Sequence, residues 1–401
     1  MDTTRGTTTP ARRQSRSTHA ADPTDSDSNS GSGTGSMMAT PVIIAARRTP
    51  IVSAHGPLAA IPASDLAAHV WRALREERPT VEPDDVLLGM ARGPGGNPAR
   101  VSALSAGWPC TVPAATIDRQ CGAGLDAICL AAAEIASGAA TAVAAGGAES
   151  ASAAEPGRAS FAPVEFGDPD MGPAAEDLAR LRNISRGRQD DYARQSHDRA
   201  VAAQDRDLLA DELVAVGDVA GDRRIKRRPP ELFPRAPGVF SADGTVTAAN
   251  SCPISDGAAG VLIVDDDVRV RLGVPGLAVR AWARAGVDPR WPGVGPTPVV
   301  HSVLQRTGWH LDDIDRIEIT EAFAAQVLAV LDDLGLEQHD PRICAEGGAI
   351  AFGHPWGASG AVLVVRLFSA LVRQGLGRRG LATCAIGGGQ GIALAVERVG
   401  P

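Results

Sequence analysis

The sequence predicts an α/β protein made of two similar halves. Short apolar strands alternate with helices over most of the chain, a pattern typical of a parallel sheet with helices on both faces. The halves also share a local order, in which a glycine-rich turn feeds an alanine-rich helix and a later strand runs into glycines. The matching stretches are CGAGLDAICLAAAEI with VAAGGAES and GASGAVLVVRLFSAL with AIGGGQGIA. Self-similarity at so long a spacing indicates a duplicated domain, with a cleft that receives residues from both copies.

The first half opens with a clear order of elements. PVIIAARRTP (41–50) reads as a buried strand that ends in a turn, and residues 64–77 have helical spacing with Ser64 as the expected N-cap. DVLLGMARG is a second short strand. Residues 115–138 then read as a strand, a tight glycine turn and a helix that stops at Gly138. The glycine turn of this unit is the first candidate position for chemistry.

The middle of the chain differs in composition. From Ala151 to about Asp243 it is rich in charged residues, proline and arginine, with one evident helix at residues 185–204. This composition predicts an insertion that lies over the core rather than within it. From residue 273 the alternation of strands and helices returns and continues to the end of the chain.

Composition argues against several classes of protein. A net charge of −8 without a long block of one sign argues against a nucleic-acid-binding surface, and no apolar stretch approaches the roughly 18 residues of a membrane helix. Six cysteines without a CxxC pair or tight cluster argue against a disulfide framework and a metal site, and favour the reducing cytoplasm. Residues 1–40 are rich in Ser, Thr, Gly and Asp, so we expect a disordered tail and no secretory signal, with Met37 or Met38 as the native start.

Cys121 is the strongest candidate for chemistry. It lies at a strand-to-helix turn beside Gly122 and Gly124, where helix amides stabilise a thiolate and are expected to lower the pKa of the thiol. The alternative is a small buried apolar residue, the usual fate of a free cysteine. His354 lies in the glycine-rich loop GHPWGASG, where it is either the base that activates a cysteine or a structural histidine.

Two further charged positions also have two interpretations. Glu321 in ITEAFAAQ is either a catalytic carboxylate or a charge at the start of a helix. The arginines of RRIKRR (223–228) either bind a phosphate or form a solvated basic turn. The residues alone leave both choices open.

Five blocks of the sequence together resemble the thiolase family, in the family's order and at similar separations. They are DRQCGAGLDAICLAAAEIASG with AGGAES, TVTAANSCPISDGAAG, TEAFAAQ, GGAIAFGHPWGASG and AIGGGQG. The resemblance implies the thiolase fold, a duplicated αβαβα five-layered sandwich with an inserted loop domain. The implied domains are a tail at 1–40, a first half at 41–150 plus 244–275, an inserted loop domain at 151–243 and a second half at 276–401.

The resemblance also implies a chemistry. Thiolases pass an acyl group from coenzyme A to a cysteine and then condense it with a second acyl-CoA, or run the reverse cleavage. Cys121 matches the acylated nucleophile, His354 matches the base that takes its proton, and the backbone amides of Cys121 and Gly387 match the oxyanion hole. Met171 and Phe323 match apolar residues that line the acyl-thioester pocket.

Binding of coenzyme A is implied at three further positions. Arg227 or Arg228 matches a residue that approaches a phosphate of coenzyme A. Cys252 replaces a serine that the family has near the pantetheine. Coenzyme A thioesters are therefore the expected substrates, with no permanently bound cofactor and no metal.

Two catalytic positions depart from the family pattern. Thr320 stands where the family has an asparagine that holds a water at the substrate thioester oxygen. Ala385 stands where the family has a second catalytic cysteine, which moves the α-carbon proton, and Cys384 is one residue early. Because side chains alternate along a strand, we expect Cys384 to point into the core, unless a bulge rotates it into the pocket.

These residues predict an acyl-CoA acyltransferase of thiolase type that forms an acyl-enzyme on a cysteine and whose carbon–carbon step is altered. The alternative is a non-catalytic or partner-dependent acyl-CoA-binding subunit. We expect a homodimer, because the short stretch 151–172 leaves little room for the extension through which many family members form tetramers. We expect no nucleic-acid or membrane partner.

Overall fold

The structure, a computed structural model, describes residues 39–400 except residues 156 and 159. Most of the expected tail therefore lies outside the described residues. Of the forty positions only the last two are described, and the carbonyl of Thr40 accepts a hydrogen bond from the amide of Asp266. The domain boundaries expected from the resemblance remain a prediction.

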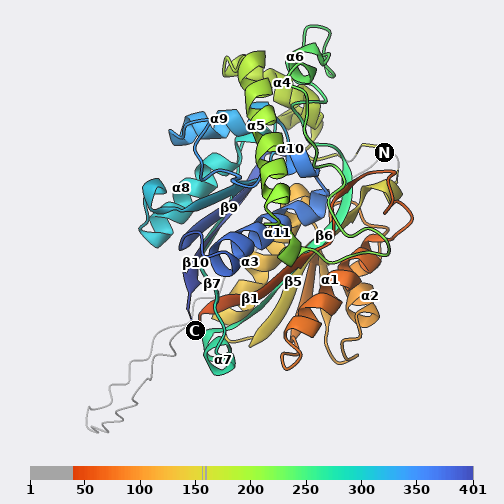
Figure 1. Cartoon of the computed structure of the whole chain (residues 1–401), viewed down its shortest axis with the longest axis vertical. Coiled ribbons are helices and arrows are strands. Elements are labelled where there is room, and N and C mark those ends of the chain that lie inside the picture. Colours follow the sequence, from red (N-terminus) through yellow and green to blue (C-terminus); the bar gives the residue numbers. More distant parts are fainter. Residues whose placement is uncertain (1–38, 156, 159, 401) are drawn as a thin grey trace, which may run out of the picture. The chain divides into compact units, whose positions relative to one another are not determined.

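Ten strands run through both halves of the described chain. They are β1 (Pro41–Arg48), β2 (Val52–Ser53), β3 (Asp85–Gly89), β4 (Ala114–Ile117), β5 (Ala142–Ser150), β6 (Ser255–Asp265), β7 (Gly276–Gly286), β8 (Arg316–Ile319), β9 (Arg379–Ile386) and β10 (Gln390–Val399). Their order is β4-β3-β5-β6-β1-β7-β10-β9-β8, and β2 pairs with β6 (Figure 1).

The strand order repeats about the junction of β1 and β7. Outward from this junction run β1, β6, β5 and β3 on one side and β7, β10, β9 and β8 on the other. On each side the first two pairings are antiparallel and the third is parallel. The junction itself is a short antiparallel contact in which Val42 and Ile43 pair with Ala278 and Leu277. The predicted duplication and α/β class are confirmed.

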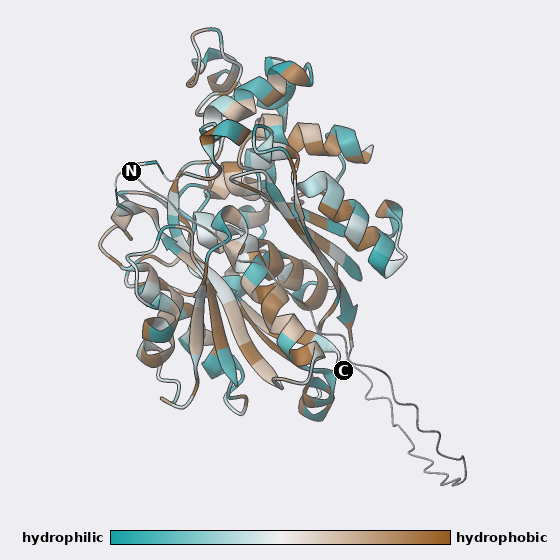
Figure 2. Ribbon diagram, turned by 180° about the vertical axis from the view of Figure 1, so that it is seen from behind, coloured by the Kyte–Doolittle hydropathy of each residue, from teal (hydrophilic) through white to brown (hydrophobic). Residues whose placement is uncertain are grey.

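Helices form layers on both sides of these strands (Figure 1). In the first half they are α1 (Ala63–Glu77), α2 (Pro98–Ser105), α3 (Ala123–Ala136) and α7 (Asp266–Leu272), and in the second half α8 (Pro296–Thr307), α9 (Ala324–Leu334), α10 (Ala349–Phe352) and α11 (Trp356–Phe368). Helices α3 and α11 pack against each other and against strands, α11 against strands of both halves. Helices α1 and α2 contact the first-half strands, and α8 contacts β7, β9 and β10. Figure 2 shows brown, apolar residues along the strands and the central helices, and teal mainly on the outer elements.

The central helices approach closely because both carry glycine. A Cβ on Gly124 of α3 would lie 2.7 Å from the carbonyl oxygen of Gly357, and one on Gly360 of α11 would lie 2.6 Å from Cβ of Leu125. Only residues without a side chain permit such contact. The contact brings the start of α3, where Cys121 lies, close to the start of α11.

Two sequence-based expectations are wrong in detail. Helix α1 begins at Ala63 with Pro62 as its N-cap, so Ser64 lies inside the first turn and is not the cap. The helical run Trp356–Arg373 is also long and apolar enough to pass a length-and-composition test for a membrane span, contrary to our reading of the sequence. Of that run, 83% is buried between the layers, as in the core helix of a globular protein.

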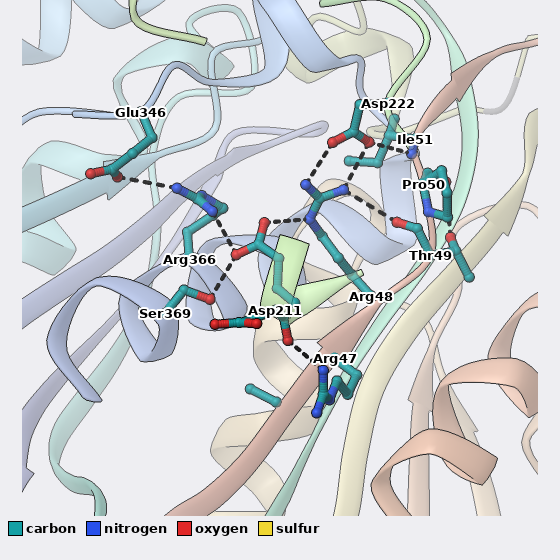
Figure 3. Close-up of polar contacts among 12 residues, drawn as sticks. Arg47, Arg48, Thr49, Pro50, Ile51, Asp211, Asp222, Glu346, Arg366 and Ser369 are labelled. Carbon is teal, nitrogen blue, oxygen red and sulfur yellow. Dashed lines mark hydrogen bonds and ion pairs between the residues drawn. The ribbon is translucent and has the colours of Figure 1, made fainter. Parts of the chain in front are cut away.

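The insertion contains α4 (Met171–Leu181), α5 (Arg186–Asp205) and α6 (Leu232–Arg235), which lie at the top of Figure 1. A buried ion network also ties loops of this region to both halves (Figure 3). Arg48 at the end of β1 donates to Glu212 at 2.7 Å and to both carboxylate oxygens of Asp222. Arg366 of α11 donates to Glu212 at 2.5 Å and to Glu346 at 3.2 Å.

The charges in this network balance the cost of burial. Burial alone would raise the pKa of the Glu212 carboxyl, but Arg366 and Arg48 outweigh it and lower that pKa to about 2. Glu212 therefore stays ionised, and the insertion is anchored through charge-assisted hydrogen bonds to the two halves.

Candidate active site

A cavity of about 390 Å³ lies where the two halves and the insertion meet. Helix α4 and the segments around residues 161 and 240 supply one part of its wall, and turns of the two halves supply the rest. Seven of the residues singled out in the sequence line it: Cys121, Met171, Cys252, Phe323, His354, Ala385 and Gly387. The cavity thus gathers residues that are far apart in the chain.

Cys121 is held by a strained turn at the start of α3. The preceding residue, Gln120, has a φ of 46°, a left-handed conformation that is uncommon for a residue other than glycine. Cys121 and its neighbours form a 3₁₀ turn, Gln120–Gly122, that leads directly into α3. Cys121 is partly exposed, and the backbone amides of Cys121 and Gly387 are close enough to its thiol to favour the thiolate. Two amide donors therefore face the same sulfur.

The electrostatics of this turn differ from the expectation. Burial raises the pKa of the Cys121 thiol, the nearby Glu149 carboxylate raises it further, and the two amides only partly compensate, which leaves it at about 12. The expected lowering of the pKa is therefore wrong, because desolvation of the thiolate exceeds the help from the helix start. At neutral pH the thiol of Cys121 is therefore in its neutral form, and attack by its sulfur would require a base.

Glu149, near the end of β5, is itself fully buried. Its carboxylate accepts hydrogen bonds from the amides of Ala91, Arg92 and Gly357 at 3.0, 3.2 and 3.0 Å. Burial raises its pKa, and the three amides oppose that rise. Glu149 thereby fixes the start of α11 relative to the loop after β3.

His354 also lines the cavity. It lies just before α11, its amide donates to the carbonyl of Pro253 at 3.0 Å, and burial lowers the pKa of its ring to about 4. Its Nδ1 lies 2.6 Å from Oγ of Ser359, and that hydroxyl donates to the carbonyl of Pro355 at 3.2 Å. In the tautomer whose Nδ1–H donates to this hydroxyl, Nε2 is free to take a proton.

Ala385, and not Cys384, faces the cavity. Strand β9 pairs with β10 in an unbroken register from Ile386 to Arg379, so there is no bulge to rotate the cysteine. Cys384 is fully buried, and its Sγ lies 3.1 Å from Oγ1 of Thr320. The cavity wall has a methyl group where the resemblance calls for a thiol.

Thr320 does not line this cavity either. Its side chain is buried between Cys384 and a separate small chamber that also contains Ser359. The structure therefore does not bring Thr320 to the position from which an asparagine would hold a water at a substrate oxygen.

The remaining charged candidates lie outside the cavity wall. Arg227 is 81% exposed and pairs with Asp205 at 2.7 Å, and neither it nor Arg228 lines the cavity. Glu321 is buried, and its carboxylate accepts from the hydroxyls of Tyr192 and Ser196 at 2.9 and 2.7 Å and from an amide. The partners of Glu321 give it the role of an anchor for α5, since they occupy both of its oxygens.

Several lining residues were missed by the sequence reasoning. Among them are Phe161, Phe240, Gln326 and Trp356. Gln326 lies one helical turn after Phe323, so the TEAFAAQ block contained a signal for it. The two phenylalanines belong to the insertion, where composition predicted cover over the core but no particular side chain.

Comparison with known proteins matches this architecture to one family. The model of the thiolase N-terminal domain matches residues 41–267, and that of the thiolase C-terminal domain matches residues 275–398. The chain is 43% identical to the "Putative acetyl-CoA C-acetyltransferase YhfS" of Bacillus subtilis over 89% of this chain and 98% of the relative. It is 39% identical to a "3-oxoadipyl-CoA/3-oxo-5,6-dehydrosuberyl-CoA thiolase" of Escherichia coli over 88% and 98% of the two chains.

A solved structure agrees with these matches. The acetyl-CoA acetyltransferase of Bacillus anthracis superimposes with a TM-score of 0.85 at 31% identity, covering 90% of this chain and all of the other. A duplicated α/β fold around a cavity with a cysteine, a histidine and converging amides defines the class of enzyme. The chain belongs to the thiolase family, and it is an acyltransferase.

Proposed function

We propose that this acyltransferase carries its acyl group on Cys121, with His354 as the base and an acyl-CoA as the donor. The observation that supports this most directly is that Cys121, His354 and the amide of Gly387 meet at one cavity. The relatives named as acetyl-CoA acetyltransferases and thiolases support a coenzyme A thioester as the substrate. The alternative of a non-catalytic subunit has no support among these comparisons.

The proposed first step conserves atoms and charge. The Cys121 sulfur attacks the thioester carbonyl carbon as its proton passes to Nε2 of His354. The oxyanion that forms accepts hydrogen bonds from the amides of Cys121 and Gly387, a type of stabilisation worth about 10²–10³ in rate per donor. The carbon–sulfur bond to coenzyme A then breaks, and the departing thiolate takes the proton from His354.

We further propose that the carbon–carbon step is impaired. That step needs a group that removes or returns the α-carbon proton, and the position expected for it is occupied by Ala385. Cys384 is turned toward Thr320 in the core, where it cannot substitute. Without a thiol at residue 385, we expect the enzyme either to transfer its acyl group to another acceptor or to condense two acyl groups slowly, with His354 as the base.

The acyl-enzyme is expected to form on one cysteine of the six. Incubation with acetyl-CoA, acid quench and peptide mass spectrometry should place the acetyl group on Cys121, because it is the cysteine that meets both a base and two amide donors. Cys110 is exposed but has neither, which makes it the internal control. Acetyl groups on Cys110 alone, or none at all, would refute the proposed function.

The oligomer is proposed to be a homodimer through the edge of the first-half strands. Strand β4 is the last strand of its edge, so its outer side is unpaired within the described chain. Beside it, Val101 and Leu104 of α2 are 50% and 45% exposed. Pairing with a second copy would cover this edge and these side chains.

A dimer is therefore the expected result of light scattering over a range of dilutions. Leu104→Glu should weaken the dimer by placing charge on the apolar face, whereas Val270→Glu, an exposed position on α7, should not. A tetramer at every dilution would contradict the proposal. All six cysteines are unpaired, which supports a cytoplasmic location.

A further inference from the structure

Gln326 of α9 is a polar residue of the active-site cavity that the proposed reaction does not use. The residue is 2% exposed, and neither Oε1 nor Nε2 has a hydrogen-bond partner among the described residues. Two other polar residues of the wall do have partners. The Ser251 hydroxyl donates to a backbone carbonyl at 2.6 Å, and the Gln120 amide donates to the carboxylate of Asp118 at 3.0 Å. Because buried polar groups normally keep a hydrogen bond, the unpaired amide of Gln326 calls for a partner.

Three elements enclose the part of the cavity that contains Gln326. They are α4, the start of α9 and the 3₁₀ turn Pro292–Val294, each of which contacts the other two. The wall residues that α4 and this turn supply are apolar or glycine: Met171, Ala174, Ala175, Leu178, Pro292 and Gly293. A Cβ on Gly293 would lie 2.8 Å from Cδ2 of Leu178 and 3.1 Å from Cγ of Gln326, so the glycine lets both side chains lie against the turn. The result is an apolar corner with one amide, which we call the Gln326 corner.

A charged group does not fit the Gln326 corner. Among the described residues of the cavity wall, Arg92 is the one permanent cation, and its Nη1 and Nη2 already donate to the carbonyls of Gly157 and Glu155. A carboxylate beside Gln326 would lose its hydration without gaining a counter-charge, which is costly in an apolar site. A neutral polar group avoids this cost, and an amide can still form a hydrogen bond with it.

We propose that the Gln326 corner is a subsite for the acyl chain and that Gln326 selects acyl-CoA substrates whose chain carries a neutral hydroxyl group. A hydroxyl has one proton and two lone pairs, so it can donate to Oε1 or accept from Nε2. A keto oxygen can only accept from Nε2, and an unsubstituted alkyl chain pairs with neither atom. The inference rests on the proposed function, in which the acyl group is carried on Cys121 in the same cavity.

The amide should favour a hydroxylated chain by a modest factor. An alkyl chain that fills the corner keeps water away from the amide and leaves both of its polar atoms unpaired. A hydroxylated chain covers the same apolar wall and also forms one hydrogen bond, whose net contribution corresponds to about fivefold in affinity. Gln326 is then a specificity-determining residue that acts on the acyl chain and not on the reacting carbon.

The first test measures binding without acyl transfer, in the full-length Cys121→Ala variant. Calorimetry compares hexanoyl-CoA with 3-, 5- and 6-hydroxyhexanoyl-CoA, which share one chain and differ only in where the hydroxyl lies. We expect at least one of the hydroxylated chains to bind about fivefold more tightly than hexanoyl-CoA. Adipyl-CoA ends in a carboxylate at a similar reach, and it should bind more weakly than hexanoyl-CoA because the corner offers no free cation.

The second test removes the amide in the same Cys121→Ala background. Gln326→Leu should make the hydroxylated and plain chains bind equally, and the ratio of two affinities in one protein cancels any general loss of binding. Gln204→Leu makes the same replacement at an exposed glutamine of α5 and should keep the preference. Because an apolar side chain replaces an amide without partners, Gln326→Leu should melt at the same temperature as its parent or higher.

Equal binding of hexanoyl-CoA and all three hydroxylated chains would overturn the inference, as would tighter binding of adipyl-CoA or a preference that survives Gln326→Leu. A large fall in the melting temperature of Gln326→Leu would show that the protein itself holds the amide, with the same consequence. If the preference is found but wild-type Cys121 takes no acetyl group, the subsite stands and the proposed function fails. Acetylation of Cys121 without the preference would support the proposed function and overturn the subsite.

Discussion

His354→Gln is expected to slow the acetylation of Cys121 by about 10²–10⁴-fold at neutral pH, the usual contribution of a general base. Both partners of the pair rest in their neutral forms, since the thiol pKa is about 12 and the imidazole pKa is about 4. Without the imidazole, the reaction depends on the fraction of thiolate, which is on the order of 10⁻⁵ at pH 7 for such a pKa. Quenched-flow acetylation followed by intact mass measures the rate directly.

The pH dependence of the acetylation rate should differ between the wild type and His354→Gln. The imidazole accepts a proton only above its own pKa, so the wild-type rate should be level from about pH 6 to pH 8 and should fall as His354 becomes protonated near pH 4. The rate of His354→Gln should instead rise with pH through this range, because the thiolate fraction grows until the pH approaches about 12. His301→Gln, an exposed histidine of α8, is the matched control and should follow the wild type. Parallel profiles for His354→Gln and the wild type would exclude His354 as the base.

The face of Cys384 was the part of the site most open to prediction. Its reading needed only the alternation of side chains along a regular strand. The structure keeps β9 in unbroken register, so Ala385 lines the cavity and Cys384 lies in the core. The duplication was also predictable from local sequence, because a glycine-rich turn lies at the start of each of the two central helices. These glycines allow the close contact between α3 and α11.

The ionisation of Cys121 could not be predicted from local sequence. A cysteine at the start of a helix suggests a low pKa for its thiol. The direction of the pKa shift of Cys121 depends instead on how deeply the turn is buried and on Glu149, which lies on β5. Desolvation is a property of the assembled core, and no short motif reports it. The same holds for Thr320, whose hydroxyl turns to Cys384 because β8 and β9 are neighbours.

Recognition of coenzyme A was the least predictable part. Arg227 and Arg228 lie in a loop of the insertion, where position depends on packing and not on a regular period. The loop leaves Arg227 in solvent, paired with Asp205. Phe161 and Phe240 of the cavity wall also come from such loops, so the sequence predicted an insertion over the core but not the contacts that it makes.

Ala385→Cys is expected to raise the thiolysis of acetoacetyl-CoA by about 10²–10⁴-fold, the usual contribution of a general acid–base group. Ala385 lines the cavity with Cys121 and His354, so a thiol at this position would face the reacting carbon. Thr320→Asn should add a smaller gain, because the side chain of Thr320 is directed at Cys384 and an amide there would first have to turn toward the cavity. The gains need not add, since such groups act as a unit.

The assay for this prediction is the loss of the absorbance of the acetoacetyl-CoA–magnesium complex, compared among the wild type, the single variants and the double variant. Ala385→Ser is the matched control, because it adds an atom of similar size whose proton is far less acidic than that of a thiol, and it should leave thiolysis near the wild-type rate. Cys384→Ala should change thiolysis little, because the thiol of Cys384 lies outside the cavity. Vigorous thiolysis by the wild type that Cys384→Ala abolishes would show that this buried thiol reaches the substrate, and that the methyl group of Ala385 is not what limits the carbon–carbon step.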